Sequence, residues 1–268
     1  SAKKKINKFF AQTEFKNKPT IFGIRAEDRR KHFYVIGKTG TGKSTLIANM
    51  AISDMRNRKG LCVIDPHGDL SEILLNYVPS FRVNDVIYLD PSDSKNAFSL
   101  NPLDVENPDQ RELVVSGIVA IFHKLYGHTW GPRLEYILRN CLLSVIKLKD
   151  PTLIMVPEIL TNDDFRRKVV EQLDDKVLRN YWVNEFEKMH PRLKSESISP
   201  ILNKVGQFTS SQLMRNIIKH PKSTIDLEKI MNEGKIVILN LSQGRIGEDN
   251  AALLGAMTIT KIQLAAMN

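Results

Sequence analysis

A glycine-rich loop near the start of the chain has the residue types and spacing that bind a triphosphate. Residues 37–45 match the pattern G-x-x-x-x-G-K-[ST]. In this pattern the glycines let successive backbone N–H groups point at the phosphates, and the helix that follows directs its positive end to the same place. We predict that Lys43 reaches the β and γ oxygens and that Ser44 ligates Mg²⁺. The predicted nucleotide-binding residues are Gly37, Lys38, Thr39, Gly40, Thr41, Gly42, Lys43, Ser44 and Thr45.

Hydrolysis also needs a carboxylate at a strand end, usually beside a glutamate that activates water. Two apolar runs end in an acid, at Asp65 and at Asp90, and each acid is followed by proline rather than by glutamate. Ligands of open α/β sheets bind at strand ends, so we predict that Asp65 contacts Mg²⁺ or its water at the nucleotide site. The alternative for both acids is turn chemistry, which we favour for Asp90.

An arginine follows the last predicted strand, in the segment Gln-Gly-Arg-Ile-Gly-Glu-Asp at residues 243–249. Such a loop is able to place the Arg245 guanidinium on the nucleotide of a neighbouring subunit, which makes it a candidate catalytic residue with Lys43 and Asp65. The other interpretation is a simple strand-to-helix turn in which Asp249 is the N-cap. The six histidines have no zinc spacing, so we expect no metal beyond Mg²⁺.

The elements that must position these residues follow an α/β pattern. Short apolar runs at 61–64 and 85–89 are typical of strands buried on both faces of a parallel sheet. A helix with apolar residues at Ile47, Met50, Ala51 and Met55 lies between two such strands. Predicted strands are 21–24, 32–36, 61–64, 85–89 and 235–241; predicted helices are 44–58, 112–126, 133–148, 163–173, 176–189, 199–208 and 249–267.

The predicted elements divide the chain into four parts. Residues 1–31 form a basic arm with a short strand, and residues 32–106 form the first part of a nucleotide-binding core. Residues 107–222 contain no convincing strand and are predicted to be a helical insertion. Residues 223–268 return to the core with a strand and a helix that is apolar almost all round.

The composition is that of a folded protein with an uneven charge. The formal net charge is +9, and residues 1–31 alone contribute +7, which suits contact with phosphate backbones as well as a solvated terminus. Tyr126, Trp130 and Trp182 are able to stack on bases, although we favour a core role for them. The two cysteines exclude a disulfide framework, and no apolar run is long enough to span a bilayer, so we expect a cytoplasmic setting.

Taken in order, these segments resemble the HerA/FtsK superfamily of ATPases, and most closely its type IV secretion and conjugative DNA-transfer branch, the TraG/TraD-like proteins. The specific parts of the match are the Asp-Pro-His-Gly-Asp turn at 65–69 and the segment 240–249. The resemblance rests on residues 33–45, 61–70, 101–104, 130–143 and 238–267.

The resemblance implies a RecA-like motor that binds ATP and Mg²⁺, forms a hexameric ring and pumps DNA or powers export, at the inner face of the membrane through secretion-machine partners. In that family the strand with the catalytic Asp-Glu pair follows the segment that matches residues 253–267. We therefore expect this pair beyond Asn268. The intact protein is expected to be the ATPase, and this chain alone to hydrolyse ATP weakly or not at all.

Four functions are compatible with these features. The first is a motor ATPase that moves DNA, and the second is an ATPase that powers a secretion machine without touching DNA. The third is a nucleotide-binding module with no turnover. A small-molecule kinase uses the same loop, but the helical insertion and the basic arm do not favour it.

Overall fold

The computed structural model describes residues 21–22, 31–36 and 41–265, with side chains from Leu46 onward. The chain divides into two compact units, one formed by the described parts of Ser1–Ala97 and Asp226–Asn268, the other by Phe98–Ile225. Most of the predicted basic arm, residues 1–31, lies outside the described residues and stays a prediction. The glycine loop at 37–40 lies outside them as well.

The first unit is built on a five-stranded sheet with the order β1-β2-β3-β5-β4. Its first strand is antiparallel to its neighbour, and the other pairs are parallel. The mixed α/β class and the mainly parallel sheet are therefore confirmed. The strands are β1 (Ile21–Phe22), β2 (Lys31–Ile36), β3 (Gly60–Asp65), β4 (Val86–Leu89) and β5 (Ile236–Asn240).

The middle of the sheet is fully buried. Every residue of β3 and of β5 is shielded from solvent, and for β3 the continuous apolar run at 61–64 predicts this burial. The prediction that the strand at 85–89 is also buried on both faces is wrong: β4 lies at the edge of the sheet, and its Tyr88 is 37% exposed. In the pairing of β3 with β5, Asp65 is the register partner of Asn240, so the carboxyl ends of the two strands coincide.

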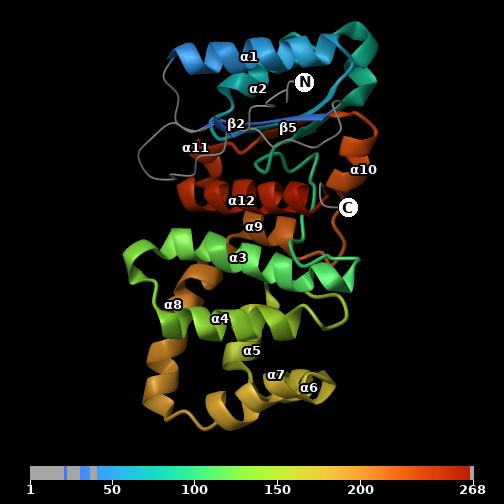
Figure 1. Cartoon of the computed structure of the whole chain (residues 1–268). Helices are drawn as coiled ribbons and strands as arrows, with labels where there is room; N and C mark the ends of the chain where they lie inside the picture. The colour runs from blue at the N-terminus through green and yellow to red at the C-terminus, as the bar shows by residue number, and fades with distance from the viewer. Residues whose placement is uncertain (1–20, 23–30, 37–40, 266–268) are drawn as a thin grey trace, which may run out of the picture. The chain divides into compact units, whose positions relative to one another are not determined.

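Two helices, α1 (Thr41–Arg56) and α2 (Asp69–Asn76), cover one face of the sheet (Figure 1). In α1 the buried stripe includes Ile47, Ala51 and Met55, which pack with α2 and with the inner strands. Met50, which the apolar spacing placed with them, is 44% exposed instead. It is adjacent to Ala51 in sequence and therefore points about 100° away around the helix.

The helix α12 (Glu248–Ala265) covers the opposite face of the same sheet (Figure 1). Gly255 of this helix lies so close to the sheet that a Cβ would come within 3.3 Å of Leu241 and 3.9 Å of Ile64. The interpretation of Asp249 as an N-cap is wrong, since the helix begins one residue earlier, at Glu248. The unit also contains α10 (Leu227–Asn232), α11 (Gln243–Ile246) and the 3₁₀ turn η1 (Ser80–Asp85).

A buried arginine ties together the end of the sheet that lies away from the strands' carboxyl ends. Arg82 is 3% exposed and donates hydrogen bonds to the backbone carbonyls of Met55, Lys59 and Gly234. It also pairs with Asp85 at 2.8 Å. One guanidinium thus satisfies the carbonyls that end α1 and those of the turns that lead into β3 and β5.

The second unit is helical, and no strand occurs between residues 98 and 225, all of which the structure describes. The helical unit begins before residue 107, its predicted start, because residues 99–101 are hydrogen-bonded to residues 222–224. Ser99 and Thr224 exchange hydrogen bonds, and the Asn101 N–H donates to Ser223. Its helices are α3 (Arg111–Tyr126), α4 (Pro132–Val145), α5 (Met155–Thr161), α6 (Asp163–Gln172), α7 (Lys176–Asn180), α8 (Pro191–Ser210) and α9 (Gln212–Ile218), with short 3₁₀ turns η2 (Pro108–Gln110) and η3 (Gly127–Thr129).

Two helices of this unit differ from their predicted extents. α8 begins at Pro191 rather than near residue 199, because proline is tolerated in a first turn and His190 caps it. The predicted helix at 176–189 changes at its centre to the π-helix η4 (Tyr181–Phe186). There the fully buried Trp182 donates a hydrogen bond to Ser144 at 2.8 Å, so packing overrides the regular helix.

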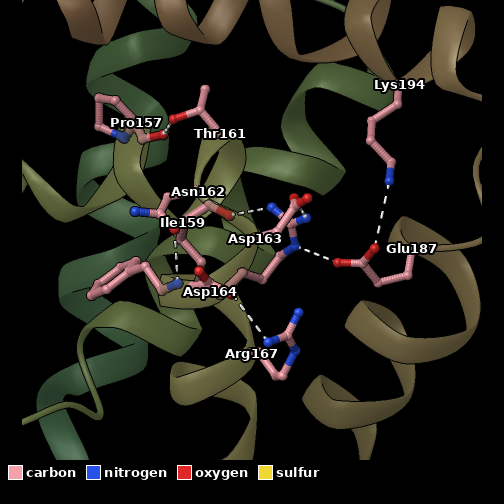
Figure 2. Close-up of polar contacts among 11 residues, drawn as sticks. Pro157, Ile159, Thr161, Asn162, Asp163, Asp164, Arg167, Glu187 and Lys194 are labelled. Carbon is pink, nitrogen blue, oxygen red and sulfur yellow. Dashed lines mark hydrogen bonds and ion pairs between the residues drawn. The ribbon is translucent and has the colours of Figure 1, made fainter.

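A buried arginine also organises the far part of the helical unit. Arg166 is 2% exposed, donates to the carbonyl of Ile159 at 3.0 Å and pairs with Asp163 and Glu187. Figure 2 shows Asp163 and Glu187 in this region, with Lys194 reaching the same Glu187. These contacts satisfy the buried charge and join α5, α6, the residue that follows η4, and α8.

Candidate nucleotide site

The phosphate-binding pattern lies between a sheet strand and a helix. β2 ends at Ile36 and is hydrogen-bonded on both sides, to β1 and to β3. The 16-residue α1 begins at Thr41, so its amino end faces the loop. Residues 37–40, and the side chains of Thr41, Gly42, Lys43, Ser44 and Thr45, lie outside the described part. A parallel strand that leads through a glycine loop into a long helix is the arrangement in which helix N–H groups bind an anion.

Asp65 lies at the carboxyl end of β3, where its carboxylate holds the following turn. Its Oδ2 atom accepts hydrogen bonds from the backbone N–H and the hydroxyl of Ser71, both at 2.8 Å. Its Oδ1 atom accepts from the backbone N–H of His67 at 3.3 Å. Asp65 is 2% exposed. The carboxylate therefore satisfies an otherwise free N–H in the first turn of α2, which is the function of a helix cap.

The turn after β3 packs directly on a side chain of β5. Gly68 has a φ of 97°, which favours glycine, and a Cβ there would lie 2.9 Å from both Nδ2 and Oδ1 of Asn240. The same Asn240 amide donates to the Tyr88 hydroxyl at 2.9 Å and accepts from the Ser242 N–H at 2.9 Å. One buried amide thus contacts the ends of three neighbouring strands.

Asp90 forms the turn that its Asp-Pro sequence predicts. Its Oδ1 atom accepts from the backbone N–H of Ser92 at 2.8 Å and from the Ser92 hydroxyl at 2.7 Å. The Ser242 hydroxyl donates to the same oxygen at 2.8 Å, which joins the end of β4 to the end of β5.

Arg245 lies on the short helix α11 at the same edge of the sheet, and its side chain is exposed. Its guanidinium donates to the Ser92 hydroxyl at 3.4 Å. The structure therefore brings Asp65, Asp90 and Arg245 to one edge of the sheet through a connected set of polar contacts. The catalytic and metal roles predicted for Asp65 and Arg245 stay predictions.

Sequence reasoning missed the polar residues that connect these side chains, namely Ser71, Tyr88, Ser92, Asn240 and Ser242. Asn240 and Ser242 follow a buried strand, and that position was the available signal, since polar residues after a buried strand gather at the ligand-binding edge. Of the three aromatic residues considered for base stacking, Tyr126 and Trp182 are buried, and Trp130 is half-buried and stacks on His123. The core role is therefore confirmed for the first two.

Two ionisable groups of this unit, Cys62 in β3 and Asp85 in η1, lie away from this edge of the sheet. Burial raises the pKa of the Cys62 thiol, which keeps it protonated and unreactive. Partial burial alone raises the pKa of the Asp85 carboxyl, but hydrogen bonds and charges from Arg82 and Lys235 outweigh it and hold this pKa below its ordinary value. No cluster of three or more metal-ligating side chains occurs among the residues that the structure describes.

The sequence of the chain matches a known protein family. The family described as "Helicase HerA, central domain" matches residues 16–259, which include the loop, both Asp-Pro turns, the helical unit and the Arg245 segment. The chain belongs to this family. Membership in a P-loop ATPase family implies nucleotide binding, and the predicted HerA/FtsK relationship is confirmed.

A curated protein is also similar to most of this chain. The chain is 20% identical over 287 aligned positions to the type 4 coupling protein DotL of Legionella pneumophila subsp. pneumophila strain Philadelphia 1. The alignment covers 88% of this chain and 36% of DotL, so this chain spans little more than a third of the length of that relative. In the described residues, no helix is both long and apolar enough to cross a bilayer.

Proposed function

We propose that the chain is the ATP-binding motor domain of a RecA-like, DNA-translocating ATPase of the conjugative-transfer type, in which ATP hydrolysis drives DNA movement. The observation that carries the proposal is that the pattern at 37–45 begins directly after β2, a strand inside a mainly parallel sheet, and continues into the amino end of α1. Family membership over residues 16–259 supports it.

In the proposed site, backbone N–H groups of residues 37–45 bind the phosphates and Lys43 neutralises the β and γ oxygens. The first turn of α1 contributes N–H groups with no partner inside the helix, which favour a bound anion by hydrogen bonding and by the helix dipole. ATP with Mg²⁺ is therefore the proposed ligand.

The hydrogen bonds of Asp65 limit its proposed role toward Mg²⁺. Both lone pairs of Oδ2 are used by Ser71, and Oδ1 keeps one after accepting from His67. This pattern favours Ser44 as the direct ligand of the metal and a contact of Asp65 through metal-bound water. When bound, Mg²⁺ neutralises developing charge on the phosphates.

Arg245 is proposed to act on the nucleotide of a neighbouring subunit in a ring. Its side chain is exposed, and among the described residues it makes one long hydrogen bond, to Ser92, which a stronger bond with a phosphate oxygen is able to replace. A ring assembly, proposed as a hexamer, is what brings such an arginine to a second nucleotide.

DNA is the proposed substrate because of the basic residues at 1–31, which suit phosphate backbones. The name of the matched relative, a type 4 coupling protein, favours partners in a secretion machine. An ATPase that powers such a machine without touching DNA is the second candidate, and the same relationship supports it.

A specific observation favours a third candidate, nucleotide binding without turnover by this chain alone. At the described edge of the sheet, Asp65 and Asp90 are both engaged in turn hydrogen bonds. Neither is placed as a free base that activates water, so turnover is proposed for the intact protein.

Calorimetry with Mg-ATP tests the nucleotide site. The parent chain should release heat on binding, and Lys43→Ala should weaken binding at least tenfold because it removes the ammonium from the phosphates. Lys59→Ala, three residues beyond the other end of α1, is the matched control and should bind as the parent does. Equal affinity of the Lys43→Ala variant and the parent, with both folded by circular dichroism, would contradict the assignment.

Filter binding over a salt series tests the DNA proposal. DNA affinity of the parent should fall steeply as salt rises, because bound cations are released from the phosphates. Removal of residues 1–20 should weaken binding and reduce the salt slope. An unchanged slope would mean that the arm is not part of a DNA site, and no DNA affinity at all would favour the secretion ATPase.

A further inference from the structure

Asn240 occupies the point where the turn after β3, the end of β4 and the segment that carries Arg245 meet. It is 9% exposed, and both atoms of its amide are used, Nδ2 by the Tyr88 hydroxyl and Oδ1 by the N–H of Ser242. The turn backbone at Gly68 lies against the same amide. An amide is needed here because one contact takes a donor and the other an acceptor.

The residue that Asn240 holds has an unusual backbone. Ser242 has φ 49° and ψ 47°, a left-handed conformation that is unfavourable for a residue with a side chain. It persists because its N–H donates to Asn240 and its hydroxyl donates to Asp90 at 2.8 Å. This turn starts α11 and sets the direction in which Arg245 leaves the sheet.

The same segment is hydrogen-bonded along its backbone to the turn after β3. The N–H of Leu241 donates to the carbonyl of Asp65 at 2.8 Å, and that of Gln243 donates to the carbonyl of Pro66 at 2.9 Å. A displacement of residues 65–68 must therefore be passed to residues 241–243, or these bonds must break. The contacts continue from Ser242 through Asp90 and Ser92 to Arg245.

We propose that Asn240 is a positioning residue that couples the turn beside the nucleotide to the orientation of Arg245. The proposal rests on the proposed function, in which Arg245 acts on a neighbouring nucleotide. Asn240 does not touch the nucleotide; it keeps Ser242 in the conformation that presents Arg245, and it transmits movement of residues 65–68 to that arginine.

Amide hydrogen exchange tests the coupling without nucleotide. Asn240→Ala should speed exchange at residues 243–247 at least tenfold and leave the β3 amides at 61–64 unchanged, because the change releases the turn and not the sheet. Asn57→Ala, an exposed asparagine after α1, is the matched control and should alter neither segment. Unchanged exchange at 243–247 in the Asn240→Ala variant would overturn the proposal.

Steady-state ATPase assays on the intact protein test the consequence for the reaction. Asn240→Ala should lower kcat at least tenfold and change the affinity for ATP less than about threefold. A merely structural defect would instead lower the active fraction of the enzyme and its melting temperature together. Asn240→Asp should be as poor, because it loses the donor to Tyr88 and places a carboxylate near Asp90. Asn57→Ala should match the parent in both constants.

A double variant decides whether Asn240 acts through Arg245. If it does, Asn240→Ala combined with Arg245→Ala should have the kcat of Arg245→Ala alone. Multiplicative losses in the double variant, or a parent-like kcat in Asn240→Ala, would overturn the proposal. Failure of the proposed function is separate, since it appears as parent-like ATP affinity in Lys43→Ala, while the exchange experiment still reports on Asn240.

Discussion

Replacement of Asp65 by alanine distinguishes its structural role from its predicted metal role. The carboxylate accepts three hydrogen bonds, two from Ser71 at 2.8 Å and one from His67 at 3.3 Å. Ser71 is fully buried, so the change leaves its N–H and hydroxyl without an acceptor and without water. We expect the amino end of α2 to loosen and its contacts with β3 and β5 to weaken.

The size of the effect follows from these contacts. A hydrogen bond to a charged group contributes about 1.5–3 kcal/mol, and removal of a buried carboxylate recovers part of its desolvation cost. We therefore expect Asp65→Ala to lower the free energy of unfolding of the α/β unit by about 3 kcal/mol. Asp65→Asn should cost about 1 kcal/mol, because its amide oxygen is able to keep both bonds from Ser71 and only the longer bond to His67 is lost.

Native-state hydrogen exchange is the appropriate assay, because Trp130 and Trp182 both lie in the helical unit and intrinsic fluorescence therefore follows that unit. Exchange of β3 and β5 amides gives the free energy of opening of the α/β unit. Asp93 provides a matched control, since its partly exposed carboxylate also accepts three hydrogen bonds. Asp93→Ala should leave these amides unchanged.

If Asp65→Ala left the protection of β3, β5 and α2 as in the parent but abolished Mg-ATP binding, the carboxylate would be a direct ligand rather than the cap of α2. Loss of protection with ATP affinity retained in the folded fraction would support the structural account.

Two further predictions concern the same unit. Because Arg82 and Lys235 hold the pKa of Asp85 below its ordinary value, the stability that Asp85 contributes is present above the unfolded pKa and is lost as pH falls through the folded pKa. Urea midpoints measured from pH 6 down to pH 2 should therefore fall less in Asp85→Asn than in the parent. Parallel curves for the two proteins would refute this. Gly68→Ala should destabilise the unit by about 1–3 kcal/mol, because φ is 97° and the new Cβ would lie 2.9 Å from the Asn240 amide; a parent-like melting temperature would contradict the close packing.

Local patterns predicted the elements that hold the candidate site. The apolar run at 61–64 predicted a strand with both faces covered, and β3 is fully buried; the similar run at 85–89 is only partly buried, because β4 is an edge strand. The glycine loop predicted a strand before it and a helix after it, and β2 and α1 occupy those places. These predictions succeeded because burial periodicity and glycine spacing are properties of short segments.

Contacts between distant segments were less accessible. The helix at 176–189 was predicted as regular, but burial of Trp182 against Ser144 accompanies a π-helix there. The helix predicted at 199–208 begins at Pro191 instead, a tolerated starting position, so Pro200 lies in the interior of α8 rather than in a first turn. In each case a tertiary contact or a cap outweighs the local preference of the residue.

The amino-acid sequence by itself determined that a phosphate-binding loop lies between a strand and a helix, and that Asp65 and Asp90 each end a strand in a turn. Only the tertiary structure decided that β5, formed by residues 236–240, inserts between β3 and β4. That insertion makes Asn240 the neighbour of Asp65, Gly68 and Tyr88. Backbone pairing between strands with similar apolar runs carries no unique sequence signal, so the partner of a strand is chosen only when the whole sheet is assembled.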